Sequence, residues 1–265
     1  MIIDTVETKD FSMDYLRFGH GGETLVILPG LSVQSVMASA EAVADAYQAL
    51  TDDYTLYLFD RRKALPAAYS VDDMARDTAE ALRALGLRRV NLFGVSQGGM
   101  IAMIMAVEQP ELIKKLVLGS TSACIGQAQH RLFDRWIRMA KRGSRTELYL
   151  DFGKALYPRD VFEKWREVLI EASKTVTQED LDRFVVLAES VKDFDITGEL
   201  HKIACPVLVI GSMDDRVLGA DASRRIAEHL KQAELYMYNG YGHAAYDTAE
   251  DYKERIARFL EDNER

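Results

Sequence analysis

One serine lies between glycines in a pattern that suggests nucleophilic chemistry. Residues 94–99 read Gly-Val-Ser-Gln-Gly-Gly, which matches the G-x-S-x-G pattern of a nucleophile elbow with Ser96 at its centre. The pattern alone is common, but here a strand-like apolar run at 90–94 precedes the serine and a helix-like run at 99–108 follows it. Because the motif requires a strand, a sharp turn and a helix, this context favours a nucleophilic serine over a junction that only packs tightly.

A serine hydroxyl needs a neighbouring base to take its proton, and histidine is the usual choice. His243 ends the glycine-containing stretch 239–243, directly after a strand-like run, so a loop could present its ring at the carboxyl edge of a sheet. The other histidines fall in helix-like segments or in a turn before the strand-like run at 25–28: His20, His130, His201 and His229. We therefore predict His243 as the general base.

A carboxylate is expected to orient that histidine and to stabilise its protonated form. Two aspartates follow the strand-like run 206–210, in the sequence Gly-Ser-Met-Asp-Asp at 211–215. Asp214, three positions after the glycine, is the predicted partner of His243, and Asp215 is the alternative, with starting the next turn or capping a helix as its structural role. No acid occurs at 120–123, so a carboxylate after the preceding strand is excluded.

The elements that would position these residues alternate between strand and helix. Strand-like runs occur at 25–28, 55–59, 90–94, 115–119, 206–210 and 234–238, helix-like runs at 38–50, 71–85, 99–108, 221–231 and 248–261, and two β-rich runs at 2–9 and 13–18 could pair as a hairpin. Parallel strands need long return connections, which the intervening helices supply. The order predicts an α/β fold with a doubly wound, mostly parallel sheet.

The alternation is interrupted in the middle of the chain. From 123 to 202 strand-like runs are missing, and apolar stripes at helical spacing, such as Phe133, Trp136, Ile137 and Ala140, replace them. We expect an α/β core domain made of residues 1–122 and 203–265, with residues 123–202 inserted as a helical cap.

Composition narrows the classes of partner. With 42 acidic and 33 basic residues the formal charge is −9, so the chain offers no basic surface of the kind that binds nucleic acid. No apolar run approaches the roughly 20 residues that span a bilayer, and the first residues do not read as a secretory signal. Cys124 and Cys205 are far apart and fit no metal-ligand spacing. We expect a cytoplasmic monomer or homodimer without metal or cofactor.

The order Ser96, Asp214, His243 and the intervals between them resemble the α/β-hydrolase superfamily over nearly the whole chain. The sequence is most similar to compact esterase and lactonase-like members whose helical cap follows the sixth strand. This resemblance implies an oxyanion hole made by the backbone N–H groups of Leu31 and Gln97, which would stabilise a tetrahedral intermediate.

Two departures from the family pattern concern loops at the same edge of the sheet. Pro29-Gly30 stands where many relatives have His-Gly, which leaves open what supports the predicted oxyanion hole. After the strand at 55–59, relatives often carry Asp followed by Arg-Gly, but this chain reads Asp-Arg-Arg-Lys at 60–63. We interpret residues 60–63 as a solvated loop, with an anion-recognising rim as the alternative.

These residues predict a serine hydrolase that cleaves a small-molecule ester, thioester or lactone through an acyl-Ser96 intermediate. An acyltransferase with the same triad and a ligand receptor with slow or no turnover are the alternatives. Candidates for an apolar acyl pocket are Met37, Met100, Trp136 and Trp165, although such spacing is also typical of a core.

Overall fold

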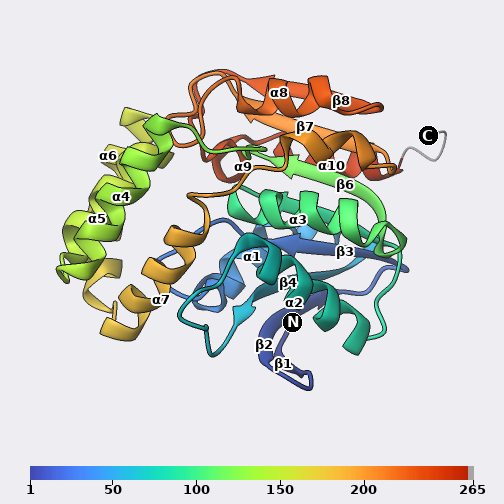
Figure 1. Cartoon of the computed structure of the whole chain (residues 1–265), viewed down its shortest axis with the longest axis horizontal. Coiled ribbons are helices and arrows are strands. Elements are labelled where there is room, and N and C mark those ends of the chain that lie inside the picture. Colours follow the sequence, from blue (N-terminus) through green and yellow to red (C-terminus); the bar gives the residue numbers. More distant parts are fainter. Residues whose placement is uncertain (262–265) are drawn as a thin grey trace.

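One eight-stranded sheet organises the computed structural model, which describes residues 1–261 (Figure 1). The strands are β1 Ile2–Glu7, β2 Ser12–Gly19, β3 Glu23–Leu28, β4 Tyr54–Arg62, β5 Val90–Val95, β6 Ile113–Gly119, β7 Val207–Ser212 and β8 Ala233–Tyr238. Their order is β1-β2-β4-β3-β5-β6-β7-β8, and β2 pairs antiparallel with β1 and β4 while the other pairings are parallel. This confirms the predicted doubly wound, mostly parallel sheet and the N-terminal hairpin.

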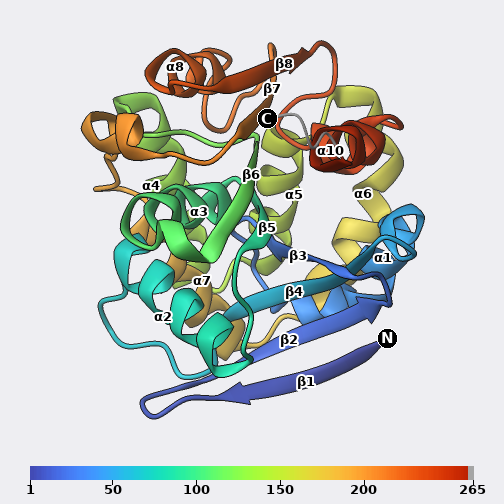
Figure 2. The same ribbon diagram turned by 90° about the vertical axis from the view of Figure 1, so that its right-hand side faces the viewer.

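Helices cover both faces of the sheet (Figure 2). One face carries α1 Ala40–Ala46 and α10 Tyr252–Glu261, and the other carries α2 Val71–Ala84, α3 Gln97–Glu108 and α8 Ala222–His229. Side chains alternate along each strand: Leu25 and Ile27 pack in the core beside α10, whereas Val26 and Leu28 pack in the core beside α3. The continuous apolar runs of the sequence are therefore strands buried on both faces.

The predicted helix boundaries are wrong in two places. The run at 38–50 is broken into a 3-10 turn at Val36–Ser39, α1, and a second 3-10 turn at Gln48–Leu50. The run at 248–261 contains a break as well, because α9 ends at Thr248 and Ala249 is extended before α10 begins. Ala249 is buried in the core beside α10, so tertiary packing outweighs its helical propensity.

Four α-helices and a 3-10 helix at Thr197–Lys202 lie between β6 and β7; the α-helices are α4 Gln127–Lys141, α5 Arg145–Leu156, α6 Arg159–Lys174 and α7 Gln178–Ser190. They gather at one side of the sheet, beyond the ends of its strands (Figure 1). The two ends of the segment meet, because the Ile196 N–H donates to the Ala123 carbonyl at 2.8 Å and Cys124 forms an isolated antiparallel bridge with Asp195. We propose the division expected from the sequence, with 123–202 as a cap on the core 1–122 and 203–265, of which 262–265 lie outside the described residues.

Candidate active site

Ser96 occupies the turn between β5 and α3 in a backbone conformation that few residues adopt. Its φ is 53° and its ψ is −119°, which costs a non-glycine residue about 1–3 kcal/mol. The turn requires glycines around it: a Cβ on Gly94 would lie 2.4 Å from the Gly98 carbonyl oxygen, and one on Gly98 would lie 2.1 Å from the Leu28 oxygen. The sequence motif thus folds as a strand, a strained turn and a helix, as predicted.

Hydrogen bonds from two elements hold the strained backbone of Ser96. Its N–H donates to the Gly119 carbonyl of β6 at 2.9 Å. Its carbonyl accepts from the Thr121 hydroxyl at 2.7 Å and from the N–H groups of Gly99 and Met100 at 2.9 and 3.2 Å. The Ser96 hydroxyl makes no capping bond to α3, so it remains available for chemistry.

His243 lies in the loop after β8, and its ring is held by an aspartate. The residue is only 1% exposed, and its Nδ1 lies 2.8 Å from Oδ2 of Asp215. The predicted partner, Asp214, makes no such contact within residues 1–261, so the prediction of Asp214 as the orienting carboxylate is wrong. The alternative considered from the sequence, Asp215, takes that place.

Asp214 holds the backbone of the loop that carries His243. Its carboxylate accepts from the Ser212 hydroxyl at 2.7 Å and from the N–H groups of Gly240 and Gly242, each at 3.0 Å. These bonds tie the end of β7 to the turn after β8. Asp214 is therefore a loop clamp, and the hydrogen bonds that it makes to the histidine loop within residues 1–261 are to the backbone.

The two oxygens of Asp215 perform two tasks, which explains the wrong prediction. Oδ1 accepts from the N–H groups of Val217 and Leu218 at 2.8 and 3.0 Å, while Oδ2 faces His243. The prediction assigns Asp215 either the capping of the next turn or the orientation of the histidine, but one carboxylate does both. The signal that could have identified it is an acid followed, two and three residues later, by buried residues whose N–H groups need an acceptor.

The ionisation of Asp215 determines the tautomer of the neutral His243 ring. Burial raises the pKa of Asp215. The charge and hydrogen bond of His243 and the two loop N–H groups together lower it by more than burial raises it, so the pKa lies below its usual range. An ionised carboxylate only accepts hydrogen bonds, so Nδ1 of His243 is the donor. In the neutral ring Nε2 then carries the free lone pair, as a general base requires.

The segment expected to supply oxyanion donors lies directly against the nucleophile. A Cβ on Gly30 would be 3.1 Å from Cβ of Ser96, which places the neighbouring Leu31 beside the elbow. Gln97 is the first residue of α3, where N–H groups have no acceptor within the helix. Neither Leu31 nor Gln97 donates from its backbone in any inter-element or loop hydrogen bond found within residues 1–261. Over those residues, neither N–H group has a backbone acceptor of this kind.

A hollow of about 510 Å³ lies between the loop after β3 and helices α5 and α6. Its wall includes Ser35, Tyr149, Phe152 and Leu156, but neither Ser96 nor His243. The hollow nevertheless adjoins the histidine loop, because the Leu156 carbonyl accepts from the Ala244 N–H at 3.1 Å. It is a candidate for the approach to the site.

The four residues predicted to line an acyl pocket are placed elsewhere, and none belongs to the wall of that hollow. Met100 and Trp136 are each 1% exposed and belong to the core beside α3. Met37 packs against the opposite core, and Trp165 is 49% exposed on α6. Their role in binding substrate stays a prediction.

Most of the charged run 60–63 is not the solvated loop that we predicted. Residues 60–62 form the end of β4, where Asp60 and Arg61 are 7% and 3% exposed, while Lys63 follows the strand and is exposed. Asp60 accepts from the Ser35 hydroxyl, from the Arg61 N–H and from Arg183 of α7. Polar partners from the loop after β3 and from α7 therefore cover these charges, a pairing of distant segments that the local sequence does not encode.

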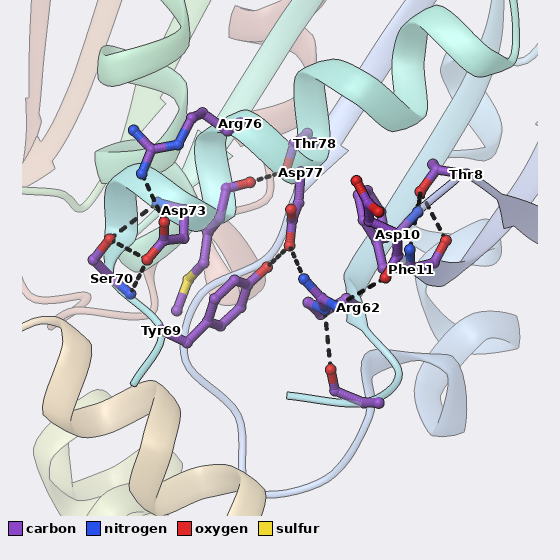
Figure 3. A network of polar contacts seen from close by, with 12 residues as sticks. Thr8, Asp10, Phe11, Arg62, Tyr69, Ser70, Asp73, Arg76, Asp77 and Thr78 are labelled. Atoms are coloured by element: carbon purple, nitrogen blue, oxygen red, sulfur yellow. Dashed lines mark hydrogen bonds and ion pairs between the residues drawn. The ribbon is translucent and has the colours of Figure 1, made fainter. Parts of the chain in front are cut away.

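Arg62, the next residue, belongs to a separate polar network that joins β4 to α2 (Figure 3). Its guanidinium lies 3.6 Å from Asp77 of α2, which also accepts a 2.6 Å bond from the Tyr69 hydroxyl. It donates to the Asp10 carbonyl at 3.2 Å and lies over the Phe11 ring. This network braces the sheet and includes none of the residues around Ser96.

Two classes of feature are missing from the described part of the chain. No helix within residues 1–261 is long and apolar enough to cross a membrane. Over the same residues, no group of three or more histidine, cysteine, aspartate or glutamate side chains could hold a metal ion.

A strained serine elbow, a buried histidine–aspartate pair and a mostly parallel sheet define an α/β-hydrolase architecture. The model of the alpha/beta hydrolase fold family matches residues 23–250, and the chain belongs to that family. A relative from Agrobacterium fabrum, named "Putative carbamate hydrolase RutD", is 27% identical over 92% of this chain and 98% of its own length. A 3-oxoadipate enol-lactonase from Acinetobacter baylyi is 21% identical over 88% of this chain and 86% of its own.

Solved structures share the fold. An alpha/beta hydrolase enzyme from a Medee basin deep-sea metagenome library superposes with a TM-score of 0.86 at 23% identity, covering 97% of each chain. The enol-lactonase from Burkholderia xenovorans superposes with a TM-score of 0.84 at 19% identity, covering 97% of this chain and 99% of its own. At these identities the likeness concerns the architecture.

Proposed function

We propose that this protein is a serine hydrolase that cleaves a small-molecule carboxylic ester, thioester or lactone through an acyl-serine intermediate. The observation that carries the proposal is the 2.8 Å contact between Nδ1 of His243 and Oδ2 of Asp215, because it leaves Nε2 free to take a proton. The strained elbow that carries Ser96 supplies the nucleophile.

The roles follow from the atoms. His243 Nε2 takes the Ser96 proton as Oγ attacks the substrate carbonyl, and Asp215 stabilises the imidazolium that forms. The N–H groups of Leu31 and Gln97 bind the oxyanion. The imidazolium then protonates the leaving group, and in a second cycle the same ring activates water to hydrolyse the acyl-Ser96 ester.

The names of relatives support the substrate class at the level of shared chemistry. A carbamate and an enol-lactone each present a carbonyl carbon bonded to a heteroatom that can leave, which is the group that an acyl-serine mechanism attacks. We therefore include carbamates among the compounds to be tested, beside simple esters and lactones. Small substrates suit the hollow of about 510 Å³ near the histidine loop.

Hydrolysis of p-nitrophenyl acetate and butyrate tests the proposal. We expect clear turnover by the intact protein, and a fall in kcat of at least about 1,000-fold in Ser96→Ala and in His243→Ala, because a triad acts as a unit. Circular dichroism verifies that each variant is folded. Undiminished turnover in Ser96→Ala, or its absence from the intact protein across esters, lactones and carbamates, would contradict the proposal.

A further inference from the structure

Arg61 is a buried guanidinium to which no carboxylate within residues 1–261 is directly bonded. The residue is 3% exposed, and its Nη2 donates to the Pro29 carbonyl at 2.8 Å and to Oε1 of Gln97 at 3.3 Å. Its Nε has no partner within residues 1–261. Buried charges are normally paired, because moving a charge out of water is costly. The burial of the Arg61 guanidinium therefore needs an explanation.

Its two hydrogen-bond acceptors belong to the two segments that carry the proposed oxyanion donors. Pro29 lies just before Gly30 and Leu31, in the segment that contacts Ser96, and Gln97 is the residue after the nucleophile. One nitrogen of Arg61 therefore ties the end of β3 to the start of α3. The spacing of Leu31 and Gln97 around an oxyanion depends on how these two segments are held together.

The side-chain nitrogen of Gln97 is also held by hydrogen bonds. Its Nε2 donates to the Leu187 carbonyl of α7 at 2.8 Å and to the Ser190 hydroxyl at 3.2 Å. Since the side-chain nitrogen is used in this way, Oε1 is left to accept from Arg61. Gln97 is thus held between the cap and Arg61, which restricts the orientation of its backbone.

The charge around Arg61 is unbalanced in favour of the positive sign. Asp60 forms a 2.7 Å ion pair with Arg183, and its charge also acts on the Arg61 guanidinium without a direct bond to it, so one nearby carboxylate faces two guanidinium groups. Burial lowers the pKa of Arg61 to about 10, which still leaves it protonated at neutral pH. A fixed positive charge in a buried site beside the elbow favours the negative charge that develops on the substrate oxygen.

We propose that Arg61 is a positioning residue of the oxyanion hole, which joins the Leu31 segment to Gln97 and adds a buried positive charge behind them. This inference rests on the proposed function. It also explains how the oxyanion hole is supported in a chain that has Pro29-Gly30, in place of His-Gly, before the Leu31 N–H donor.

The test compares Arg61→Gln and Arg61→Lys with the matched control Arg62→Gln. We expect Arg61→Gln to lower kcat for p-nitrophenyl butyrate by about 10- to 100-fold, less than the loss of a donor itself, with KM changed by less than about threefold. Its affinity for phenylboronic acid, which adds to the serine as a tetrahedral anion, should fall by a similar factor. Arg61→Lys should restore part of both. Arg62→Gln should lower the melting temperature but keep kcat and boronate affinity.

The outcomes separate the two proposals. If Arg61→Gln folds and keeps both kcat and boronate affinity, the role of Arg61 is refuted while the hydrolase proposal stands. The same holds if Arg62→Gln loses as much kcat and boronate affinity as Arg61→Gln does. If Arg61→Gln does not fold, Arg61→Lys decides, and unchanged values in that variant refute the role. If the intact protein neither turns over esters nor binds the boronate, the proposed function fails, and the role of Arg61 fails with it.

Discussion

The imidazole of His243 is hydrogen-bonded through Nδ1 to Oδ2 of Asp215 at 2.8 Å, and the two side chains are 2% and 4% exposed. Burial of both groups strengthens their interaction, because little water screens it. The other oxygen of Asp215 is held by two loop N–H groups, so the carboxylate cannot turn away from the ring. The histidine is thereby fixed in one tautomer and one orientation.

Replacing each aspartate in turn should distinguish their roles. Asp215→Asn removes the ionised acceptor and favours the wrong tautomer of His243, so we expect kcat to fall by about 10,000-fold. Asp214→Asn keeps an oxygen for only one of the two loop N–H groups, but it leaves the hydrogen bond between His243 and Asp215 in place, so we expect less than about a tenfold loss. Ester hydrolysis by both variants measures the difference, and equal losses would show that the hydrogen bond to Asp215 has no special role.

The hydrogen bonds of the Asp214 carboxylate should make the free energy of unfolding depend on pH in acidic solution. Burial raises the pKa of Asp214, but the Ser212 hydroxyl and the Gly242 and Gly240 N–H groups lower it below its usual range. A depressed pKa stabilises the folded state above the unfolded-state value of about 3.9, and this contribution is lost as the pH falls through the folded-state pKa.

Asp214→Asn should therefore be less stable than the intact protein at pH 7, with a difference that shrinks as the pH falls below about 4. Urea unfolding of both proteins between about pH 3 and pH 7 measures the free energies. A difference that stays constant across this range would mean that the ionisation of Asp214 does not stabilise the loop.

Close packing of the elbow predicts a large cost for one methyl group. A Cβ on Gly98 would meet the Leu28 oxygen at 2.1 Å, and the neighbouring strand and helix leave no room to move. We expect Gly98→Ala to lower the free energy of unfolding by about 3 kcal/mol or more. The matched control is Gly22→Ala, where the added Cβ would meet no atom of residues 1–261 within 4 Å apart from its chain neighbours, so the change should stay within about 0.5 kcal/mol. Similar unfolding midpoints for the two variants would contradict this account of the elbow.

Much of the fold could be predicted from the sequence because it rests on local patterns. The apolar runs that became β5 and β7 are buried along their whole length, and the alternation with helices fixes a parallel sheet. The break at Ala249 could not be predicted in this way, since it depends on which side chain the core accepts there. Helix boundaries are decided by such tertiary contacts.

The site was predictable where one motif determines one geometry, and less so where distant segments meet. The strained turn at Ser96 could be predicted from its glycines, and the position of His243 in a loop after a strand from the preceding apolar run, while their catalytic roles stay predictions. The choice between Asp214 and Asp215 depends on a one-residue difference in a turn, which no spacing in the sequence resolves. The burial of Arg61 depends on segments far away in the chain, since its contacts are Pro29 and Gln97.

Covalent labelling of the nucleophile tests the central claim most directly. The intact protein is treated with a fluorophosphonate, and the adduct is located by peptide mass spectrometry, with Ser96→Ala and His243→Ala treated in parallel. We predict one adduct, on the peptide that contains Ser96, with none in Ser96→Ala and a much slower reaction in His243→Ala, because the reagent reacts only with an activated serine. Absence of labelling from the folded intact protein, or labelling at another residue with Ser96 unmodified, would contradict the account.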